Sequence, residues 1–285
     1  MNTLGTFVIV NDKLTRRNEV VFGLESRAVR FSDGFFESMR AFGLDVPLLA
    51  FHYERIKKAW CIYRFDSEIP SIKTLSDAIE RLLKSNKHFG SARIRLTFYR
   101  SGEGLYLPTK NQADWYLETF ASDDKEFTLN TKGKQIGIYS DFYKPSHPFF
   151  NIKTNQALIY TQAAWWAQIN NLDDAILLNK QQCLIEATSS NIFVCIGNIV
   201  YTPPLTDGCV NGVMRRFLIQ ELFPSLDIEY KEVSLTKQFL LDADEVFLSN
   251  AVQGIQWVVG FQNRRYFNSL AKKITQKLND FRLQS

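Results

Sequence analysis

Three short apolar runs stand close together between residues 183 and 202, and they restrict the possible folds more than any other feature of the chain. Two of the runs flank a polar cluster, and the pair Gly197-Asn198 separates the second run from the third. A Gly-Asn pair between two strand-like segments favours a two-residue hairpin turn. Neighbouring strands joined by hairpins argue against a doubly wound parallel sheet and for an α+β fold.

The rest of the chain mixes helical and strand patterns without strict alternation, which again favours α+β. Apolar spacing predicts helices at 51–65, 71–88, 154–170, 211–223 and 267–281. Strand patterns occur at 6–14, 92–100, 114–121, 135–140, 174–179 and 244–258, where 6–14 and 244–258 each include a turn. Ser71 is a typical helix start. The helix at 154–170 is apolar nearly all round and is therefore expected to be buried. Two prolines predict a loop at 141–151.

The length and one polar stretch suggest two domains. The chain has 285 residues, and the segment 122–134 interrupts the regular patterns with charged and polar residues. We therefore expect a small N-terminal α+β domain over 1–121, a linker over 122–134, and a larger C-terminal α+β domain over 135–285.

Composition excludes several classes of protein. Apolar residues make up 45% and charged residues 22%, which are ordinary globular values. The net charge of +4 is spread along the chain, so we expect no nucleic-acid partner, although an anionic ligand would fit. The beginning of the sequence does not resemble a signal peptide, and no apolar run reaches the roughly 18 residues of a membrane span.

The cysteines and histidines do not predict a metal site. The four cysteines include no C-x-x-C pair, and the three histidines include no H-x-x-x-H pair. We expect free thiols in a reducing cytoplasm and no bound metal.

The polar cluster between the first two runs contains Glu186, Thr188, Ser189, Ser190 and Asn191. Alone, an acid at the end of a strand is most often a solvated charge. Its neighbours form a longer series, namely Glu186-x-Thr188-x-x-Asn191-Ile192-Phe193, Val200-x-Thr202 and Val210-x-Gly212-Val213-x-Arg215. This series resembles the signature of the class IV aminotransferases, the enzymes that bind pyridoxal 5'-phosphate (PLP) on the two-domain fold of D-amino acid and branched-chain aminotransferases.

The resemblance implies roles for particular residues. Lys153, in FNIKTNQAL, matches the lysine that binds PLP covalently, and Glu186 matches the acid that pairs with the pyridine nitrogen. Arg55 matches the arginine that binds the phosphate. Further cofactor contacts are implied for Gly212, Val213 and Met214 at a helix start, for Asn250 and Ala251 in a turn, and for Asn191.

The segment 31–42, FSDGFFESMRAF, matches the part of the family that faces the substrate. It offers Phe36 and Arg40 as substrate contacts and Ser38 as a hydroxyl among the catalytic residues. A substrate carboxylate would need a cation, and the candidates are Arg40, Arg93, Arg95 and Arg100. Of these we select Arg40 and Arg100 as substrate-binding residues.

The family contains several activities, and the sequence leaves two open. The run YTPPLTDGCVNGVMRRF and the turn Ser249-Asn250-Ala251 are similar to those of 4-amino-4-deoxychorismate lyases, which release pyruvate and 4-aminobenzoate for folate biosynthesis. The run FFESMRAF is instead similar to branched-chain aminotransferases, and a D-amino acid aminotransferase fits the same machinery. In either case the resemblance implies a small amino substrate and a homodimer.

Overall fold

The computed structural model describes residues 4–284, which fall into two compact units. The units consist of Met1–Glu126 with Ile152–Gln156, and of Phe127–Asn151 with Ala157–Ser285. The segment that carries Lys153 thus groups with the N-terminal unit, whereas the sequence analysis counted it with the C-terminal part. The expected domain boundaries stay a prediction.

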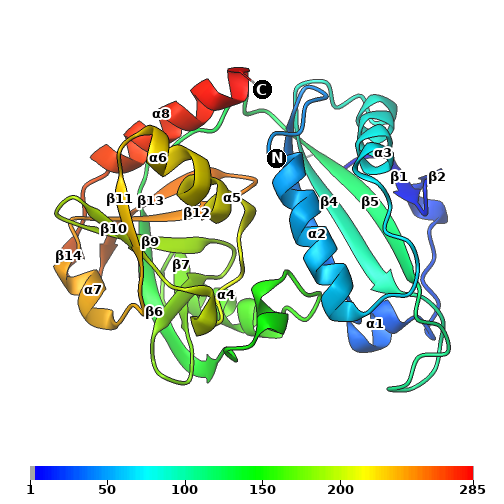
Figure 1. Cartoon of the computed structure of the whole chain (residues 1–285), viewed down its shortest axis with the longest axis horizontal. Coiled ribbons are helices and arrows are strands. Elements are labelled where there is room, and N and C mark those ends of the chain that lie inside the picture. Colours follow the sequence, from blue (N-terminus) through cyan, green and yellow to red (C-terminus); the bar gives the residue numbers. More distant parts are fainter. Residues whose placement is uncertain (1–3, 285) are drawn as a thin grey trace. The chain divides into compact units, whose positions relative to one another are not determined.

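The N-terminal unit is built on a five-stranded antiparallel sheet with the order β2-β1-β5-β4-β3 (Figure 1). Its strands are β1 (Phe7–Val10), β2 (Lys13–Arg16), β3 (Gly34–Phe42), β4 (Ser91–Arg100) and β5 (Ala113–Ser122). The strands predicted at 6–14, 92–100 and 114–121 are confirmed. Strand β3, for which the sequence analysis named no element, pairs with β4 along its whole length.

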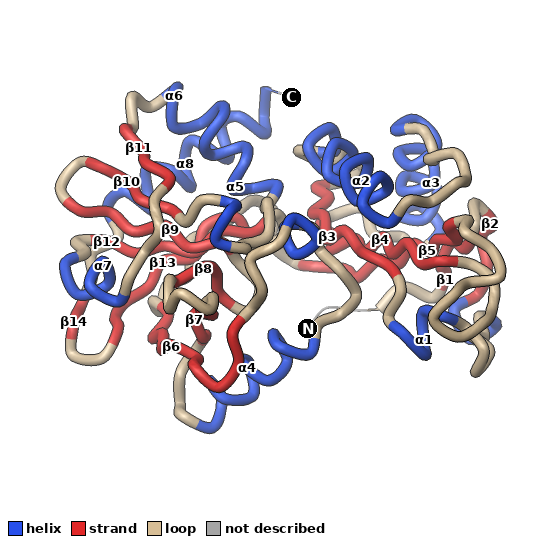
Figure 2. The backbone as a smooth tube through the Cα atoms, turned by 60° about the horizontal axis from the view of Figure 1, so that its bottom comes forward, coloured by secondary structure: helices blue, strands red, loops and turns tan. Residues whose placement is uncertain are grey.

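Two helices cover one face of this sheet, and Figure 2 shows them on the same side. Helix α2 (Leu49–Tyr63) packs on β3, and α3 (Ile72–Ser85) packs on β1 and β5. The predicted start of α3 is confirmed, because the Ser71 hydroxyl accepts a hydrogen bond from the Thr74 amide at 3.0 Å. The unit also contains the short helices η1 (Arg17–Glu19) and α1 (Arg27–Phe31).

The C-terminal unit contains a mixed sheet that closes on itself. Strands pair in the order β9-β12-β13-β6-β7-β8, and β8 pairs again with β9, so these six strands form a ring. Strands β10 and β11 extend the sheet from β9, and β14 pairs with β13. The strands are β6 (Lys134–Tyr143), β7 (Asp174–Leu178), β8 (Leu184–Ala187), β9 (Asn191–Ile196), β10 (Ile199–Thr202), β11 (Glu229–Glu232), β12 (Glu245–Asn250), β13 (Gly254–Phe261) and β14 (Arg264–Arg265).

The hairpin predicted around Gly197-Asn198 is confirmed as the β9–β10 turn, where Ile196 lies opposite Ile199. The helices of this unit are α4 (Leu158–Ile169), α5 (Val213–Phe217), α6 (Phe223–Ser225), α7 (Lys237–Asp242) and α8 (Ser269–Gln284), with short turns η2 (Pro148–Asn151), η3 (Leu205–Asp207) and the π-helical η4 (Leu218–Leu222). The helix predicted at 211–223 is therefore the series α5, η4 and α6, and the loop predicted at 141–151 is shortened by β6 and η2.

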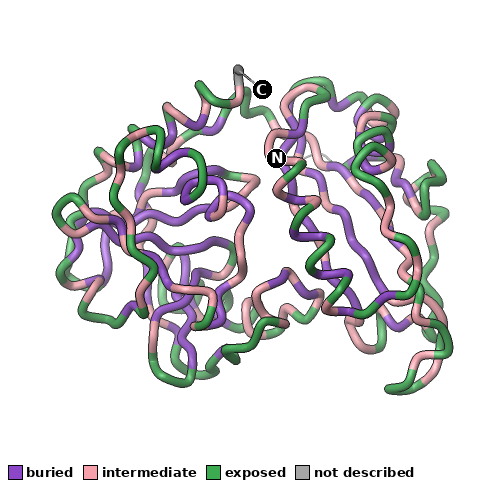
Figure 3. Tube along the Cα trace, in the orientation of Figure 1, coloured by how far each residue is buried: buried purple, intermediate pink, exposed green. Residues whose placement is uncertain are grey.

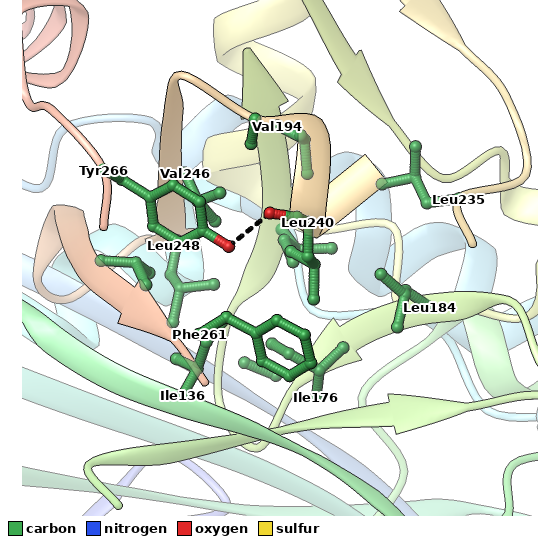
Figure 4. Packing of buried hydrophobic residues seen from close by; sticks show 14 of the residues in the cluster. Ile136, Ile176, Leu184, Val194, Leu235, Leu240, Val246, Leu248, Phe261 and Tyr266 are labelled. Atoms are coloured by element: carbon green, nitrogen blue, oxygen red, sulfur yellow. Dashed lines mark hydrogen bonds between the residues drawn. The ribbon is translucent and has the colours of Figure 1, made fainter. Parts of the chain in front are cut away.

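Every strand of the ring contributes side chains to one apolar core (Figure 4). Val194 from β9, Val246 from β12 and Ile176 from β7 meet there at 0–1% exposure, and the Tyr266 hydroxyl closes the cluster by donating to the Leu240 carbonyl at 2.7 Å. Burying one such aliphatic side chain contributes about 1.5–3 kcal/mol. Figure 3 shows much of this sheet as buried tube, whereas the C-terminal end of β6 is exposed. The ring is therefore a rigid support for residues at its strand ends.

The expectation that the helix at 154–170 is buried is wrong. Helix α4 begins only at Leu158, and it packs on β6 and β7 through Ala163 and Ala167, which are 0% and 3% exposed. Its opposite side leaves Trp165 and Ile169 60% and 61% exposed. The small alanines let the helix approach the sheet closely, but nothing in the described chain covers the outer face of the helix.

Candidate active site

Glu186 lies where the ring of strands closes. It sits in β8, opposite Leu177 of β7 on one side and Asn191 of β9 on the other. The turn between β8 and β9 is short, and the Ala187 amide donates to the Ser190 carbonyl at 2.8 Å across it. Since Glu186 is only 3% exposed, it is not the solvated charge that an isolated acid would suggest.

Three donors hold the Glu186 carboxylate. Lys144 and the Tyr160 hydroxyl, the latter at 2.8 Å, both donate to Oε1, and the Val210 amide donates to Oε2 at 2.8 Å. Sequence reasoning missed Lys144 and Tyr160. In the sequence they are a lysine within the loop predicted at 141–151 and a tyrosine early in an apolar helix, and neither marks a partner for a distant acid.

The polar cluster after Glu186 fixes the turn that carries it. Asp174 Oδ1 accepts hydrogen bonds from the Thr188 amide at 3.2 Å and from the Thr188 hydroxyl at 2.6 Å. On the other side, Asn250 donates to the Ser190 hydroxyl at 3.0 Å. Ser189 is exposed. The cluster is therefore mainly a set of local supports between neighbouring strands.

Asn191 and Gly212 come into close contact. The Asn191 side-chain amide donates to the Val210 carbonyl at 2.8 Å, and a Cβ on Gly212 would lie 1.9 Å from Asn191 Oδ1. Only glycine fits there, so the backbone can pass directly over Asn191. Helix α5 follows, and the amides of Val213 and Met214 lie in its first turn, where helical amides have no intrahelical acceptor.

The turn with Asn250 and Ala251 is also well defined. Asn250 Oδ1 accepts from the amides of Val252 and Gln253 at 3.0 and 2.8 Å, which shapes the turn between β12 and β13. The preceding Ser249 hydroxyl is buried at 1% exposure and makes no hydrogen bond with any residue the structure describes. A buried hydroxyl of this kind suits a polar ligand group.

In the N-terminal unit, Lys153 lies beside strand β3. Its carbonyl accepts from the Phe36 amide at 2.9 Å, and its ammonium nitrogen lies 4.6 Å from the centre of the Phe36 ring. Thr154 then pairs with Phe35 in an isolated bridge. The lysine is partly exposed, and its backbone is fixed to the strand that carries Phe36 and Ser38.

Arg55 is buried at 4% and bound to Glu37. Its Nε donates to Oε1 at 2.7 Å and its Nη2 to Oε2 at 2.5 Å, while His52 Nδ1 lies 2.6 Å from Oε2. Burial alone would raise the pKa of Glu37, but the charge and hydrogen bonds of Arg55 and His52 lower it to about 2. Burial, together with the charges of Arg55 and Lys153, lowers the pKa of His52 despite Glu37.

The structure brings some of the predicted substrate residues together and separates others. Ser38 lies opposite Arg95 in the β3–β4 pairing, and the Arg95 guanidinium lies 3.7 Å from the centre of the Phe36 ring. Arg40 donates to the Ser91 hydroxyl at 2.7 Å and to Asp124 at 3.0 Å. Paired residues of adjacent strands share a face, so Phe36, Ser38 and Arg95 share theirs.

Arg100 belongs to the opposite face of the sheet. It donates to Asp33 at 3.0 Å and to the Tyr63 carbonyl at 3.0 Å, and its guanidinium lies 4.9 Å from the Phe65 ring centre. Phe65 in turn packs against Phe35. These partners belong to the packing under helix α2. The structure therefore does not bring Arg100 to the face that carries Phe36.

The two units carry the lysine, acid and arginine that the sequence matched to the class IV signature, namely Lys153, Glu186 and Arg55. A model of the family described as amino-transferase class IV matches residues 34–260, and the chain belongs to this family. PLP is accordingly its cofactor. The residues fit that group, since they offer a buried anion, Glu186, and the buried Ser249 hydroxyl, which has no partner among the described residues.

Individual relatives have different activities. The chain is 24% identical to a D-alanine aminotransferase of Staphylococcus haemolyticus over 276 residues, covering 96% of each chain. It is 25% identical to an aminodeoxychorismate lyase of Bacillus subtilis over 248 residues, covering 86% of this chain and 83% of the relative. Its fold matches the branched-chain aminotransferase of Thermoproteus uzoniensis with a TM-score of 0.86 at 24% identity, covering 96% and 93%.

The described residues include neither a membrane-spanning helix nor a cluster of metal-binding side chains. No helix of residues 4–284 is long and apolar enough to cross a membrane. The same part of the chain contains no group of three or more His, Cys, Asp or Glu side chains that could hold a metal ion.

Proposed function

We propose that the chain is a 4-amino-4-deoxychorismate lyase, which forms 4-aminobenzoate and pyruvate in folate biosynthesis. The observation that carries this proposal is that Met214 and Ala251, in the two segments expected to meet the cofactor, have no hydroxyl group. These positions lie in the runs 201–217 and 249–251, which are similar to those of the lyases. Similarity to the lyase of Bacillus subtilis over 248 residues supports it.

Bound PLP supplies an electron sink for the carbon that carries the substrate amine. We propose that the Lys153 amine takes the proton from that carbon. The bond between the neighbouring ring carbon and the enolpyruvyl oxygen then breaks, and the enolpyruvate leaves and takes up a proton to become pyruvate. The six-membered ring becomes aromatic, so no oxidant and no second substrate are needed.

The other residues would bind and orient. We propose that the Glu186 carboxylate holds the proton on the pyridine nitrogen. We also propose cofactor contacts for Arg55, Gly212, Val213, Met214, Asn250 and Ala251. Asn191 supports the backbone at Gly212 through its bond to the Val210 carbonyl. The bidentate pair with Glu37 keeps the Arg55 guanidinium in one orientation.

For the substrate, we propose that Phe36, Ser38 and Arg40 line its site and that Arg95 binds a carboxylate. Arg95 shares a face of the sheet with Ser38. Its guanidinium lies over the aromatic ring of Phe36, and the Lys153 ammonium lies over the same aromatic ring. Arg40 has Asp124 as an ion-pair partner, and Arg100 is bound on the other face. Arg95 is therefore better placed than either of them.

An aminotransferase is the second candidate, and one observation favours it. Glu37 belongs to the run FFESMRAF, which is similar to branched-chain aminotransferases, and it forms the buried pair with Arg55. In that case Lys153 would take the same proton and return it to the cofactor, and a 2-keto acid would complete the cycle. The D-alanine aminotransferase among the relatives supports this alternative.

The test uses the purified protein with PLP and no keto acid. With 4-amino-4-deoxychorismate, a lyase forms equal amounts of 4-aminobenzoate and pyruvate in many turnovers. An aminotransferase needs an acceptor such as 2-oxoglutarate, and it would instead convert D-alanine or a branched-chain amino acid. Amino-acid turnover with an acceptor and none of the lyase products would overturn the lyase proposal.

We also propose that the protein is a homodimer in the cytoplasm. The exposed apolar side of α4, with Leu158 at 73% and Trp165 at 60% exposure, supports association of copies, because monomers rarely expose neighbouring large apolar side chains. All four cysteines are free, as a reducing compartment would favour. Light scattering of the purified protein measures the oligomeric state.

A further inference from the structure

Lys144 and Tyr160 reach Glu186 from two different elements. Lys144 directly follows the last residue of β6 and is 2% exposed. Tyr160 lies in the first turn of α4, and although part of the residue is exposed, its hydroxyl faces the buried carboxylate. The Lys144 ammonium also lies 5.4 Å from the centre of the Tyr160 ring. The three side chains therefore form one cluster.

The two oxygens of the Glu186 carboxylate differ in their partners. Oε1 accepts from both Lys144 and Tyr160, and Oε2 accepts from the Val210 amide. An ionised carboxylate has about four lone-pair sites, two on each oxygen. Both sites of Oε1 are used within the protein, so Oε2 is the oxygen with capacity for one more donor.

The cluster also favours one protonation state. The side chains of Lys144 and Glu186 are 3% and 4% exposed, so each charge depends on the other. Lys144 is anchored further by its bond to the Phe150 carbonyl at 3.1 Å. Burial first, and then the charge and hydrogen bond of Glu186, raise the pKa of Tyr160 well above its ordinary value. Tyr160 therefore keeps its proton and remains a donor.

We propose that Lys144 and Tyr160 are positioning residues that keep Glu186 ionised and leave Oε2 to the pyridine nitrogen of PLP. This inference rests on the proposed role of Glu186. Lys144 supplies the charge that keeps the carboxylate ionised. Tyr160 fixes the rotation of the carboxylate, since it occupies the second site of Oε1. Neither residue touches the reacting atoms.

The test compares variants of the whole protein by PLP binding. Lys144→Met, Lys144→Arg and Tyr160→Phe are each titrated with PLP, from mildly acidic to mildly alkaline pH, and the absorption of lysine-bound PLP is followed. Two controls remove similar groups elsewhere in the same unit. Lys231→Met breaks the pair with Glu229, and Tyr266→Phe removes the bond to Leu240.

Loss of a hydrogen bond to a charged group corresponds to about 10–100-fold in affinity. We therefore expect Lys144→Met to weaken PLP binding by about that factor, because Oε1 of Glu186 loses its cationic donor. Lys144→Arg should bind within a few-fold of wild type. Tyr160→Phe should also lose affinity, because Oε1 loses its second donor.

Three results would overturn the inference. Lys144→Met could bind PLP with wild-type affinity, or it could lose no more affinity than Lys231→Met. If Lys144→Met does not fold, Lys144→Arg and Tyr160→Phe replace it in the test. Binding of PLP by Tyr160→Phe as tight as by Tyr266→Phe would overturn the inference. Wild-type protein that shows no absorption of lysine-bound PLP would instead overturn the proposed function.

Discussion

Arg55 and Glu37 form a bidentate ion pair in the interior of the N-terminal unit, with Nε–Oε1 at 2.7 Å and Nη2–Oε2 at 2.5 Å. The pair joins helix α2 to strand β3, and both side chains are at most 5% exposed. It therefore connects a proposed cofactor contact to the strand that carries the proposed substrate residues. Removing either partner would leave the other charge buried alone.

Glu37→Gln should destabilise the protein by about 3–5 kcal/mol, the usual cost of breaking a buried pair from one side. It should also weaken PLP binding, because Arg55 would lose the partner that orients it. Urea unfolding measures the first effect and PLP titration the second. The matched control is Glu80→Gln, whose pair with Lys84 lies on an exposed helix surface. Equal effects of the two substitutions would contradict a special role for Glu37.

The same cluster predicts how stability depends on pH. The pKa of Glu37 is about 2 in the folded protein, against an ordinary 4.5. Below about pH 4.5 the unfolded chain takes up a proton at Glu37 that the folded protein does not take up. The contribution of Glu37 to the free energy of unfolding is therefore complete above about pH 4.5. It is lost, by roughly 3 kcal/mol, as the pH falls towards 2. Because burial lowers the pKa of His52 below 6.5, His52 begins to favour unfolding already below about pH 6.5.

Unfolding free energies measured across this range check the pH prediction. Wild-type protein should lose stability gradually below about pH 6.5 and steeply below about pH 4.5. In Glu37→Gln the steep part should be much smaller. If the unfolding free energy of Glu37→Gln falls in acid as steeply as that of the wild type, other carboxylates cause most of the acid destabilisation.

Gly212→Ala should disturb the site through Asn191. The new Cβ would lie 1.9 Å from Asn191 Oδ1, so the asparagine or the backbone of Val210 must move. We expect a loss of about 1–3 kcal/mol in stability and weaker PLP binding. The control Gly90→Ala places a Cβ where nothing lies within 4 Å, and it should be nearly neutral. A Gly212→Ala protein as stable as Gly90→Ala would show that this contact relaxes freely.

Local patterns predicted much of the fold. Ser71 marked the start of α3, and Gly197-Asn198 marked the β9–β10 turn, because each signal acts within a few residues. The α4 helix was found, but its burial was misjudged. Apolar spacing indicates a helix and says nothing about whether another element covers each side of it.

The site was only partly accessible from the sequence. The signature located Glu186, Asn191 and Gly212, which lie within one stretch of chain. Lys144 is 42 residues from Glu186, and the contact exists only because the ring of strands closes beside the end of β6. Arg95 and Arg100 lie on opposite faces of β4. Which residues of β3 share the face of each arginine depends on the strand register, which composition does not reveal.

Arg95→Gln should raise KM for a carboxylate substrate by about 10–100-fold, the value of a hydrogen-bonded charge, and change kcat less. The reason is that Arg95 shares the face of Ser38 and Phe36 and is proposed to bind the substrate rather than the cofactor. PLP affinity should stay within a few-fold. Arg64→Gln, at an exposed position, is the control. An unchanged KM would exclude Arg95 as the carboxylate ligand.

Lys153→Ala should abolish the visible absorption of lysine-bound PLP and reduce turnover by several orders of magnitude, because no other amine is proposed to hold the cofactor or move the proton. Absorption of the dialysed protein after incubation with PLP is the measurement. Lys58→Ala removes an exposed lysine from the same unit and should behave as wild type. Retained absorption together with activity would place the PLP lysine elsewhere in the chain.

Glu186→Gln should still bind PLP when the cofactor is in excess, with an affinity lowered about as far as in Lys144→Met, but it should slow turnover by about 10²–10³-fold, the usual effect of removing one electrostatic stabiliser of the transition state. Glutamine keeps the shape of the side chain and can still accept the Val210 amide, but it has no charge to hold a proton on the pyridine nitrogen. Glu245→Gln is the matched control, since Glu245 is a buried carboxylate of the same unit that accepts the Leu270 amide at 2.9 Å. Absorption spectra separate bound cofactor from lost cofactor, and single-turnover rates then measure the chemistry. Near-normal rates in Glu186→Gln would remove Glu186 from the proposed role, and with it the reason for Lys144 and Tyr160 to hold it ionised.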